Sequence, residues 1–270
     1  MRLNTMESNL ETDAPKRWVG ASPEGLASAM VLAAGRGERM RPLTDTAPKP
    51  MLKVHGKPLM QWHMEALAKA GHPDQLINTA WLGPQIEAHF GLNPDLPNGG
   101  RVHLRYSHEG KEFGYALETA GGIVRALPFL APVFWVVAGD IYAPQFDFAP
   151  AIAKEFVRSD KLAHIWLVPN PAHNPKGDFG LSSEGLALNL PKTATLFTFS
   201  TLALYKKEFF AAALTGMPEG NPQGKAAPLA PLLRAAMDRG LVSASLYTGA
   251  WTDVGTPERL RDLNQSPATP

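Results

Sequence analysis

The sequence contains no cysteine among its 270 residues. Disulfide bonds, thiolate metal sites and a cysteine nucleophile are therefore excluded, and a cytoplasmic location is compatible with this composition. An excess of one charge is also missing, because 26 basic residues stand against 25 acidic ones. A broad nucleic-acid surface needs an excess of basic residues, so we expect no nucleic acid partner and only a local anion site.

Long apolar runs are absent as well. None approaches the roughly 20 residues that cross a bilayer, so we expect no membrane insertion. Residues 1–27 are polar, carry Pro15 and Pro23, and lack the apolar segment of a secretory signal, which predicts a flexible tail. Residues 28–270 are long enough for a single large α/β domain, and the chain is 44% hydrophobic.

Two common phosphate-binding patterns are missing. No Gly-Lys-Ser/Thr follows the glycines at 35 and 37, and no Gly-x-Gly-x-x-Gly is present there, which argues against a generic kinase and a Rossmann oxidoreductase. What is present is an apolar run over residues 30–34 that breaks at Gly35-Arg36-Gly37. This pattern predicts a buried strand ending in a tight turn that can hold phosphates, with charge from Arg36, Arg39, Arg41 and Lys49.

Strand and helix patterns alternate along most of the chain. We expect strands at residues 30–34, 75–81, 101–106, 133–140, 161–169 and 244–247, and short β segments between 174 and 205. We expect helices at residues 59–69, 84–90, 117–127, 147–159, 206–214 and 229–239, and one that starts at Thr256-Pro257. This rhythm predicts a parallel sheet covered on both faces, with ligands at the carboxyl ends of its strands.

Some single residues allow two interpretations. Asp140 ends a buried apolar run and is either a Mg²⁺ ligand or a cap of the next turn. Thr119 could cap the helix that follows, and Gly121 and Gly122 either make room for a flat group or merely loosen the helix start. We expect three of the histidines, His63, His164 and His173, to pack or to face solvent and not to bind a metal.

The motifs together are more specific than each alone. From about Met30 to about Arg261 they resemble the sugar-1-phosphate nucleotidyltransferases, and most closely the N-acetylmuramate-1-phosphate uridylyltransferases of bacterial cell-wall recycling. The motifs are LAAGRGERMRPLT, Pro48-Lys49-Pro50, LETAGG at residues 117–122, Gly139-Asp140, Gly177-Asp178-Phe179 and WTDVGTP at residues 251–257. The resemblance implies a three-layer Rossmann-like (GT-A-like) α/β fold, mostly parallel, with a small antiparallel sugar-binding subregion.

The resemblance also implies substrates, a cofactor and residue roles. The substrates would be UTP and a sugar 1-phosphate, and the cofactor would be Mg²⁺. Arg39 and Lys49 would be catalytic, Asp178 would bind the sugar, and Asp140 and Asp253 would bind the metal. The nucleotide-binding set would be Ala33, Ala34, Gly35, Gly37, Glu38, Arg39, Lys49, Glu118, Gly121 and Gly122.

Besides the Rossmann oxidoreductase, against which the missing Gly-x-Gly-x-x-Gly argues, two alternatives stay open. A mannose-1-phosphate guanylyltransferase or a glucose-1-phosphate thymidylyl- or uridylyltransferase would share the fold. Only the Leu-Glu-Thr segment favours uridine as the base of the nucleotide. A non-catalytic homologue that senses sugar nucleotides should have lost one of Arg39, Lys49, Asp140 and Asp253, and the chain keeps all four. We further expect the two aspartates to repel each other in the metal-free protein, so that removing one would not lower stability.

Overall fold

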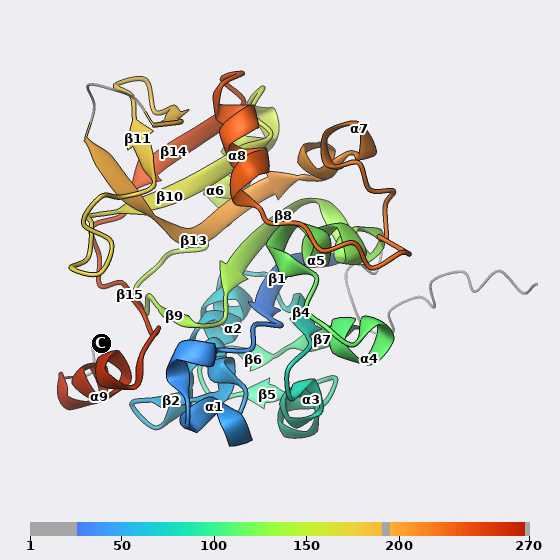
Figure 1. Cartoon of the computed structure of the whole chain (residues 1–270), viewed down its shortest axis with the longest axis vertical. Coiled ribbons are helices and arrows are strands. Elements are labelled where there is room, and N and C mark those ends of the chain that lie inside the picture. Colours follow the sequence, from blue (N-terminus) through green and yellow to red (C-terminus); the bar gives the residue numbers. More distant parts are fainter. Residues whose placement is uncertain (1–25, 191–194, 268–270) are drawn as a thin grey trace, which may run out of the picture.

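The computed structural model describes residues 26–190 and 195–267, which form a mixed β-sheet with helices on both faces (Figure 1). Residues 1–25, and with them nearly all of the expected tail, lie outside the described residues, as do 191–194 and 268–270. Ala27, which we expected in the tail, is instead the buried first residue of strand β1 and pairs with Leu130. The predicted tail boundary is therefore too late in the sequence.

The bounds of the elements follow the predicted rhythm. The strands of the main sheet are β1 Ala27–Ala33, β4 Asp74–Thr79, β7 His103–His108, β8 Leu130–Ala138, β10 Ala163–Val168, β11 Phe179–Leu181, β12 Ala187–Leu188, β13 Leu196–Lys206 and β14 Val242–Leu246. Short strand pairs are formed by β2 Lys53–Val54 with β3 Lys57–Pro58, β5 Asp95–Leu96 with β6 Gly100–Arg101, and β9 Ile141–Tyr142 with β15 Thr252–Asp253. The helices are α1 Leu43–Thr46, α2 Leu59–Lys69, α3 Gly83–Phe90, α4 Glu109–Phe113, α5 Glu118–Ala126, α6 Pro150–Arg158, α7 Ala212–Thr215, α8 Ala230–Met237 and α9 Pro257–Gln265. No helix within the described ranges has the length and apolar character needed to cross a membrane.

The main sheet has a parallel and a largely antiparallel half. β8, β1, β4 and β7 lie side by side in that order and run parallel. On the other side of β8 the long strand β13 runs antiparallel to it and also pairs with β10 and β11. The predicted α/β class is confirmed, but the antiparallel region is larger than expected, because the 11-residue strand β13 serves both β8 and the smaller strands.

Two hydrophobic cores lie on the two faces of the sheet. In β8, Phe134 and Val136 belong to one core, and Trp135 and Val137 belong to the other, as side chains alternate along a strand. Helices α5 and α8 cover the first core, and α2, α3 and α6 cover the second (Figure 1). A strand covered on both faces must be apolar throughout, which explains the continuous run over residues 133–138.

Helix α2 agrees with its predicted range, and His63 lies on its buried face. The ring is 1% exposed, and its Nε2 donates a hydrogen bond to the carbonyl oxygen of Ile141 at 2.8 Å. Burial lowers the pKa of His63 to about 4, so the ring is neutral near pH 7. The prediction of a packing histidine is confirmed, and this hydrogen bond ties α2 to the residue that follows Asp140.

One predicted helix is wrong. Instead of a helix over residues 206–214, the chain forms a 3-10 turn, Lys207–Phe210, and the short α7, separated by an extended Ala211. Phe209 and Phe210 are both buried. Phe210 packs against Phe134 and Phe209 packs against Tyr205, so this segment is held by core contacts that the local helical pattern does not contain.

The remaining differences are at the ends of elements. The strand expected over 75–81 ends at Thr79, and the helix expected over 147–159 begins at Pro150. Thr119 does not cap α5, because this helix already begins one residue earlier and has no side-chain cap. Terminal turns depend on what they pack against, which a local pattern does not contain.

Helix α9, near the end of the chain, lies beside strand β2 from its early part (Figure 1). The side-chain amide of Asn264 in α9 donates to the Lys53 carbonyl oxygen at 3.1 Å and accepts from the His55 N–H at 2.8 Å. A small apolar cluster that includes Met40 and Val254 fills the space beneath this contact. The late segment with Asp253 is thereby fixed beside the turn that follows β1.

A buried carboxylate, Glu109, joins three elements. Its Oε1 accepts from the amide of Asn78 in β4 at 2.7 Å, and its Oε2 accepts from the Leu117 N–H before α5 at 2.7 Å. The Asn78 amide oxygen in turn accepts from the N–H of Ala33 at the end of β1, at 2.9 Å. Burial raises the pKa of Glu109, and the hydrogen bonds from Leu117 and Asn78 oppose that shift. This network sets the position of Leu117 relative to the end of β1.

We predict that Glu109→Gln lowers the free energy of unfolding by about 1–3 kcal/mol, because the new amide turns a donor toward either Asn78 or Leu117. Urea unfolding followed by circular dichroism measures the change. The control is Glu112→Gln on the same short helix, which breaks a partly exposed ion pair with Arg125 and should cost below about 1 kcal/mol. Equal losses in the two variants would contradict a special role for Glu109.

Candidate active site

Two adjoining cavities open at the carboxyl ends of β1 and β8, with volumes of about 750 and 250 Å³. Gly35, Lys49 and Asp140 line both of them. This is the edge at which open α/β sheets bind ligands, and the larger volume is in the range of small-molecule sites. The sequence prediction of a site at this edge therefore agrees with the cavities.

The turn after β1 has the shape of an anion-binding loop. Gly37 has a φ of +67°, and a Cβ on it would lie 3.0 Å from Thr44 Cγ2 and 3.2 Å from Lys49 Cβ. Conformation and space both require glycine there. At Gly35 no atom lies within 4 Å of where a Cβ would be, so its backbone is open to both cavities. Ala33 and Ala34 line the larger cavity next to it.

The three arginines of this loop differ in their contacts. The guanidinium of Arg36 donates to the Thr44 carbonyl oxygen at 2.8 Å and lies 3.6 Å from the ring centroid of Trp81. Arg41 pairs with Glu38 at 3.3 Å. Arg39 is exposed, lines the smaller cavity with Glu38, and has no ion pair within the described part of the chain. Arg39 is thus the loop arginine that remains available to an anion.

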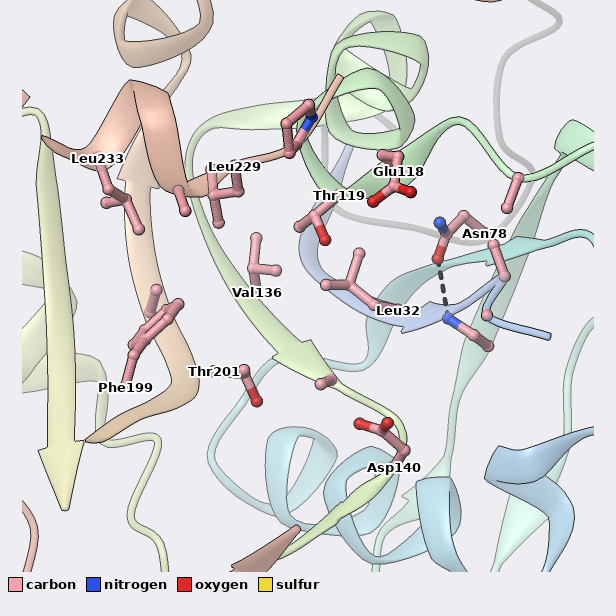
Figure 2. Close-up of a pocket in the computed structure, with 18 of the residues that line it drawn as sticks. Leu32, Asn78, Glu118, Thr119, Val136, Asp140, Phe199, Thr201, Leu229 and Leu233 are labelled. Atoms are coloured by element: carbon pink, nitrogen blue, oxygen red, sulfur yellow. Dashed lines mark hydrogen bonds between the residues drawn. The ribbon is translucent and has the colours of Figure 1, made fainter. Parts of the chain in front are cut away.

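Lys49 and Asp140 form the charged centre of the site. The Lys49 side chain is buried, and its Nζ lies 2.6 Å from Oδ2 of Asp140. Asp140 follows the end of β8 and is 38% exposed, with its carboxylate directed into the larger cavity (Figure 2). A buried lysine beside an accessible carboxylate can neutralise an incoming phosphate without reorganisation of water.

Asp253 is brought close to Asp140 by backbone pairing. Strands β9 and β15 place it opposite Ile141, and the N–H of Val254 donates to the Asp140 carbonyl oxygen at 3.0 Å. Its own carboxylate accepts from a guanidinium N–H of Arg259 and lies 2.7 Å from Nε2 of His173.

The expectation of two repelling aspartates is wrong, because each has its own cationic or imidazole partner. The sequence analysis also left His173 without a role, since nothing local in the chain indicates that it meets a residue 80 positions later. Among the described residues no three side chains of the His, Cys, Asp and Glu types form a metal cluster. Of the two aspartates, Asp140 lines both cavities and Asp253 lines neither. Carboxylate oxygens are donors of the kind that Mg²⁺ binds, together with substrate phosphates.

At the start of α5, the residues that line the larger cavity are only partly those expected. Glu118, with a φ of +60°, and Thr119 line the larger cavity opposite Asp140 (Figure 2). Gly121 and Gly122 do not line it. A Cβ at Gly121 would lie 2.5 Å from the Lys225 carbonyl oxygen, and one at Gly122 would lie 2.5 Å from the Glu109 carboxylate. These two glycines let other parts of the chain approach the helix, and the structure does not bring them to the cavity.

The far end of the larger cavity is lined by the antiparallel half of the sheet. Asp178 lies there, as predicted, but its Oδ2 already accepts the Phe199 N–H at 2.9 Å. Thr201 also lines the cavity and has a φ of +63°, which is rare for a β-branched residue. It lies where β13 shifts its register against β10. Sequence analysis missed Asn78, Phe199 and Thr201, because no local pattern marks a bulge or a cavity wall.

Comparisons with known proteins agree with this geometry. A family model described as nucleotidyl transferase matches residues 28–269. An N-acetylmuramate alpha-1-phosphate uridylyltransferase from Neisseria meningitidis serogroup B is 43% identical over 87% of this chain and 95% of its own length. One from Caulobacter vibrioides is 30% identical over 85% of this chain and 92% of its own length.

The fold also has relatives among solved structures. A candidate glucose-1-phosphate thymidylyltransferase from Bacillus anthracis superposes with a TM-score of 0.68 at 20% identity, covering 88% of this chain and 93% of that one. At that identity the likeness shows the fold alone. The family match and the near-full-length relatives show that the chain belongs to the nucleotidyl transferase family, among its sugar-1-phosphate nucleotidyltransferases.

Proposed function

We propose that the protein transfers a uridylyl group from UTP to N-acetylmuramate 1-phosphate, giving UDP-N-acetylmuramate and pyrophosphate. The observation that carries this proposal is the 43% identity to the Neisseria uridylyltransferase across 95% of that protein. N-acetylmuramate is a sugar of the bacterial cell wall, so the product would return a wall fragment to biosynthesis. UTP is a cytoplasmic nucleotide, which favours a cytoplasmic enzyme.

In the proposed reaction an oxygen of the sugar 1-phosphate attacks the α-phosphorus of UTP, the bond to the bridging oxygen of the β-phosphate breaks, and pyrophosphate leaves. The attacking phosphate is already deprotonated near neutral pH, so no general base is needed. Lys49 would neutralise charge where the two phosphates meet, and Arg39 with the backbone of Gly35 and Gly37 would hold the leaving pyrophosphate. Asp178 would face the sugar at the other end of the cavity.

The carboxylates of Asp140 and Asp253 would hold Mg²⁺. When bound, the metal supplies positive charge that offsets the charge of the triphosphate. The backbone pairing of β9 with β15 supports this assignment, because it brings the main chain of Asp253 next to that of Asp140, 113 positions earlier in the printed sequence. Their present partners, Lys49 and Arg259, are cations that the phosphates of the substrates would also attract.

A substrate matrix tests the proposed reaction. Purified full-length protein is combined with UTP, CTP, GTP or dTTP and with the 1-phosphates of N-acetylmuramate, N-acetylglucosamine, glucose or mannose, and pyrophosphate release is measured. We expect the highest kcat/KM for UTP with N-acetylmuramate 1-phosphate. A higher value for GTP with mannose 1-phosphate, or for dTTP with glucose 1-phosphate, would replace the proposal, and no release with any pair would indicate a non-catalytic homologue.

Lys49→Ala should lower kcat by roughly 10²-fold or more, the scale for removing one preorganised charge from a transition state. Circular dichroism should show that the variant is folded, because the Asp140 carboxylate left behind is partly exposed. The matched control is Lys53→Ala, four residues further on, whose side chain is exposed and lines neither cavity. Turnover like that of the wild type in Lys49→Ala would remove this residue from the mechanism.

Asp140→Asn and Asp253→Asn should each abolish the increase in melting temperature that Mg²⁺ with UTP gives the wild type. Without ligands each variant should be less stable by about 1–2 kcal/mol, because Lys49 or Arg259 loses its charged partner. Differential scanning fluorimetry with and without the two ligands measures both effects. If one variant keeps the full shift, its aspartate is structural, and the two-carboxylate site is wrong.

A further inference from the structure

The larger cavity extends well beyond the phosphate end. Past Asp178 it is lined by Phe179 and Phe199 from the sheet and by Leu229 and Leu233 around the start of α8 (Figure 2). Near Lys49 the same cavity is lined by Gly35, Arg36, Pro50 and Asp140, so charged groups are concentrated at that end. The cavity therefore offers a second, chemically different subsite.

One cation, Arg234, lines this apolar subsite from helix α8. Its Nη1 donates to the side-chain oxygen of Asn189 at 2.7 Å, and its Nη2 lies 3.5 Å from the Asp178 carbonyl oxygen. Its guanidinium carbon lies 4.9 Å from the ring centroid of Phe179. All of these contacts are to uncharged groups.

The other two cations of the cavity differ from Arg234. Lys49 pairs with Asp140 at 2.6 Å, and Arg36 pairs with Asp45 at 3.1 Å. In residues 26–190 and 195–267 no carboxylate oxygen lies within ion-pair distance of Arg234. The Asp178 carboxylate does not pair with Arg234. Its oxygens accept hydrogen bonds from the Phe199 N–H and the Asn174 amide instead. An arginine that is partly removed from water and lacks a counter-charge is a site for an anion.

The proposed sugar carries an anion that common sugar phosphates lack. N-acetylmuramate is N-acetylglucosamine with a lactyl ether on O3, which adds a carboxylate and a methyl group. A sugar with its 1-phosphate at Lys49 and its ring beside Asp178 would have its substituents within reach of Arg234, because Arg234 lines the same cavity and lies 3.5 Å from the Asp178 carbonyl oxygen. A carboxylate suits the planar guanidinium fork, and a methyl group suits the neighbouring phenylalanine and leucine side chains.

We propose that Arg234 binds the lactyl carboxylate of N-acetylmuramate 1-phosphate and so selects this sugar over N-acetylglucosamine 1-phosphate. The inference rests on the proposed function, because it assigns a residue to the sugar named there. It makes Arg234 a specificity-determining residue that leaves the phosphate chemistry untouched. Removing the Arg234 side chain should therefore weaken the binding of N-acetylmuramate 1-phosphate and leave that of N-acetylglucosamine 1-phosphate unchanged.

The test compares kcat/KM for the two sugar phosphates at saturating UTP in the wild type and in Arg234→Gln. For N-acetylmuramate 1-phosphate we expect a fall of about 10- to 100-fold, mostly in KM, the scale of a charge-assisted bidentate contact. For N-acetylglucosamine 1-phosphate and for the KM of UTP we expect changes below about threefold. Arg234→Lys should lie between wild type and Arg234→Gln, because it keeps the charge but loses the fork.

Arg239→Gln is the control. Arg239 comes two residues after the end of α8 and does not line the cavity. Equal losses for both sugars in Arg234→Gln would show that Arg234 only supports α8, and would overturn the inference. An unchanged preference in Arg234→Gln would overturn it as well. A wild type that does not prefer N-acetylmuramate 1-phosphate would instead overturn the proposed function, and the inference with it.

Discussion

The close approach of strands β1 and β8 is the constraint on which the site depends. The N–H of Gly139 donates to the Leu32 carbonyl oxygen at 2.8 Å, and a Cβ at Gly139 would lie 2.9 Å from that same oxygen. Any side chain there would push the two strand ends apart. Lys49 and Asp140 would then separate, although their charged atoms lie 2.6 Å from each other in the structure. Because Gly139 has no side chain, the loop after β1 can lie close to the carboxylate that follows β8.

The charges of the site are balanced within the protein. Lys49 faces Asp140, and Arg259 with His173 faces Asp253, so the metal-free site does not hold two bare carboxylates. A polyanionic substrate would compete with these carboxylates for the same cations. We therefore expect substrate entry and rearrangement of the pairs to be coupled. Arg234 is different, because its contacts in the described chain are to uncharged groups, and an anion there would displace nothing charged.

Local sequence patterns were sufficient for much of this fold. Helix α2 was predicted over its observed range, and the continuous apolar run before Asp140 predicted a strand buried on both faces. These patterns succeed because the period of side-chain burial is a property of consecutive residues. The spacing of motifs also indicated the family and the edge of the sheet that carries the site. The helix expected over residues 206–214 is interrupted at Ala211, just after the buried Phe209 and Phe210, and the local pattern did not reveal this interruption.

The sequence by itself thus determined the order of elements, the glycine turn after β1 and which residue types reach the carboxyl edge of the sheet. Only the tertiary structure decided their partners. It paired Asp253 with His173, used Gly121 and Gly122 to admit other chain segments instead of a ligand, and left Arg234 beside a cavity wall. The physical reason is that short-range contacts between side chains far apart in sequence depend on register and packing. Neither register nor packing is encoded in any short stretch of residues.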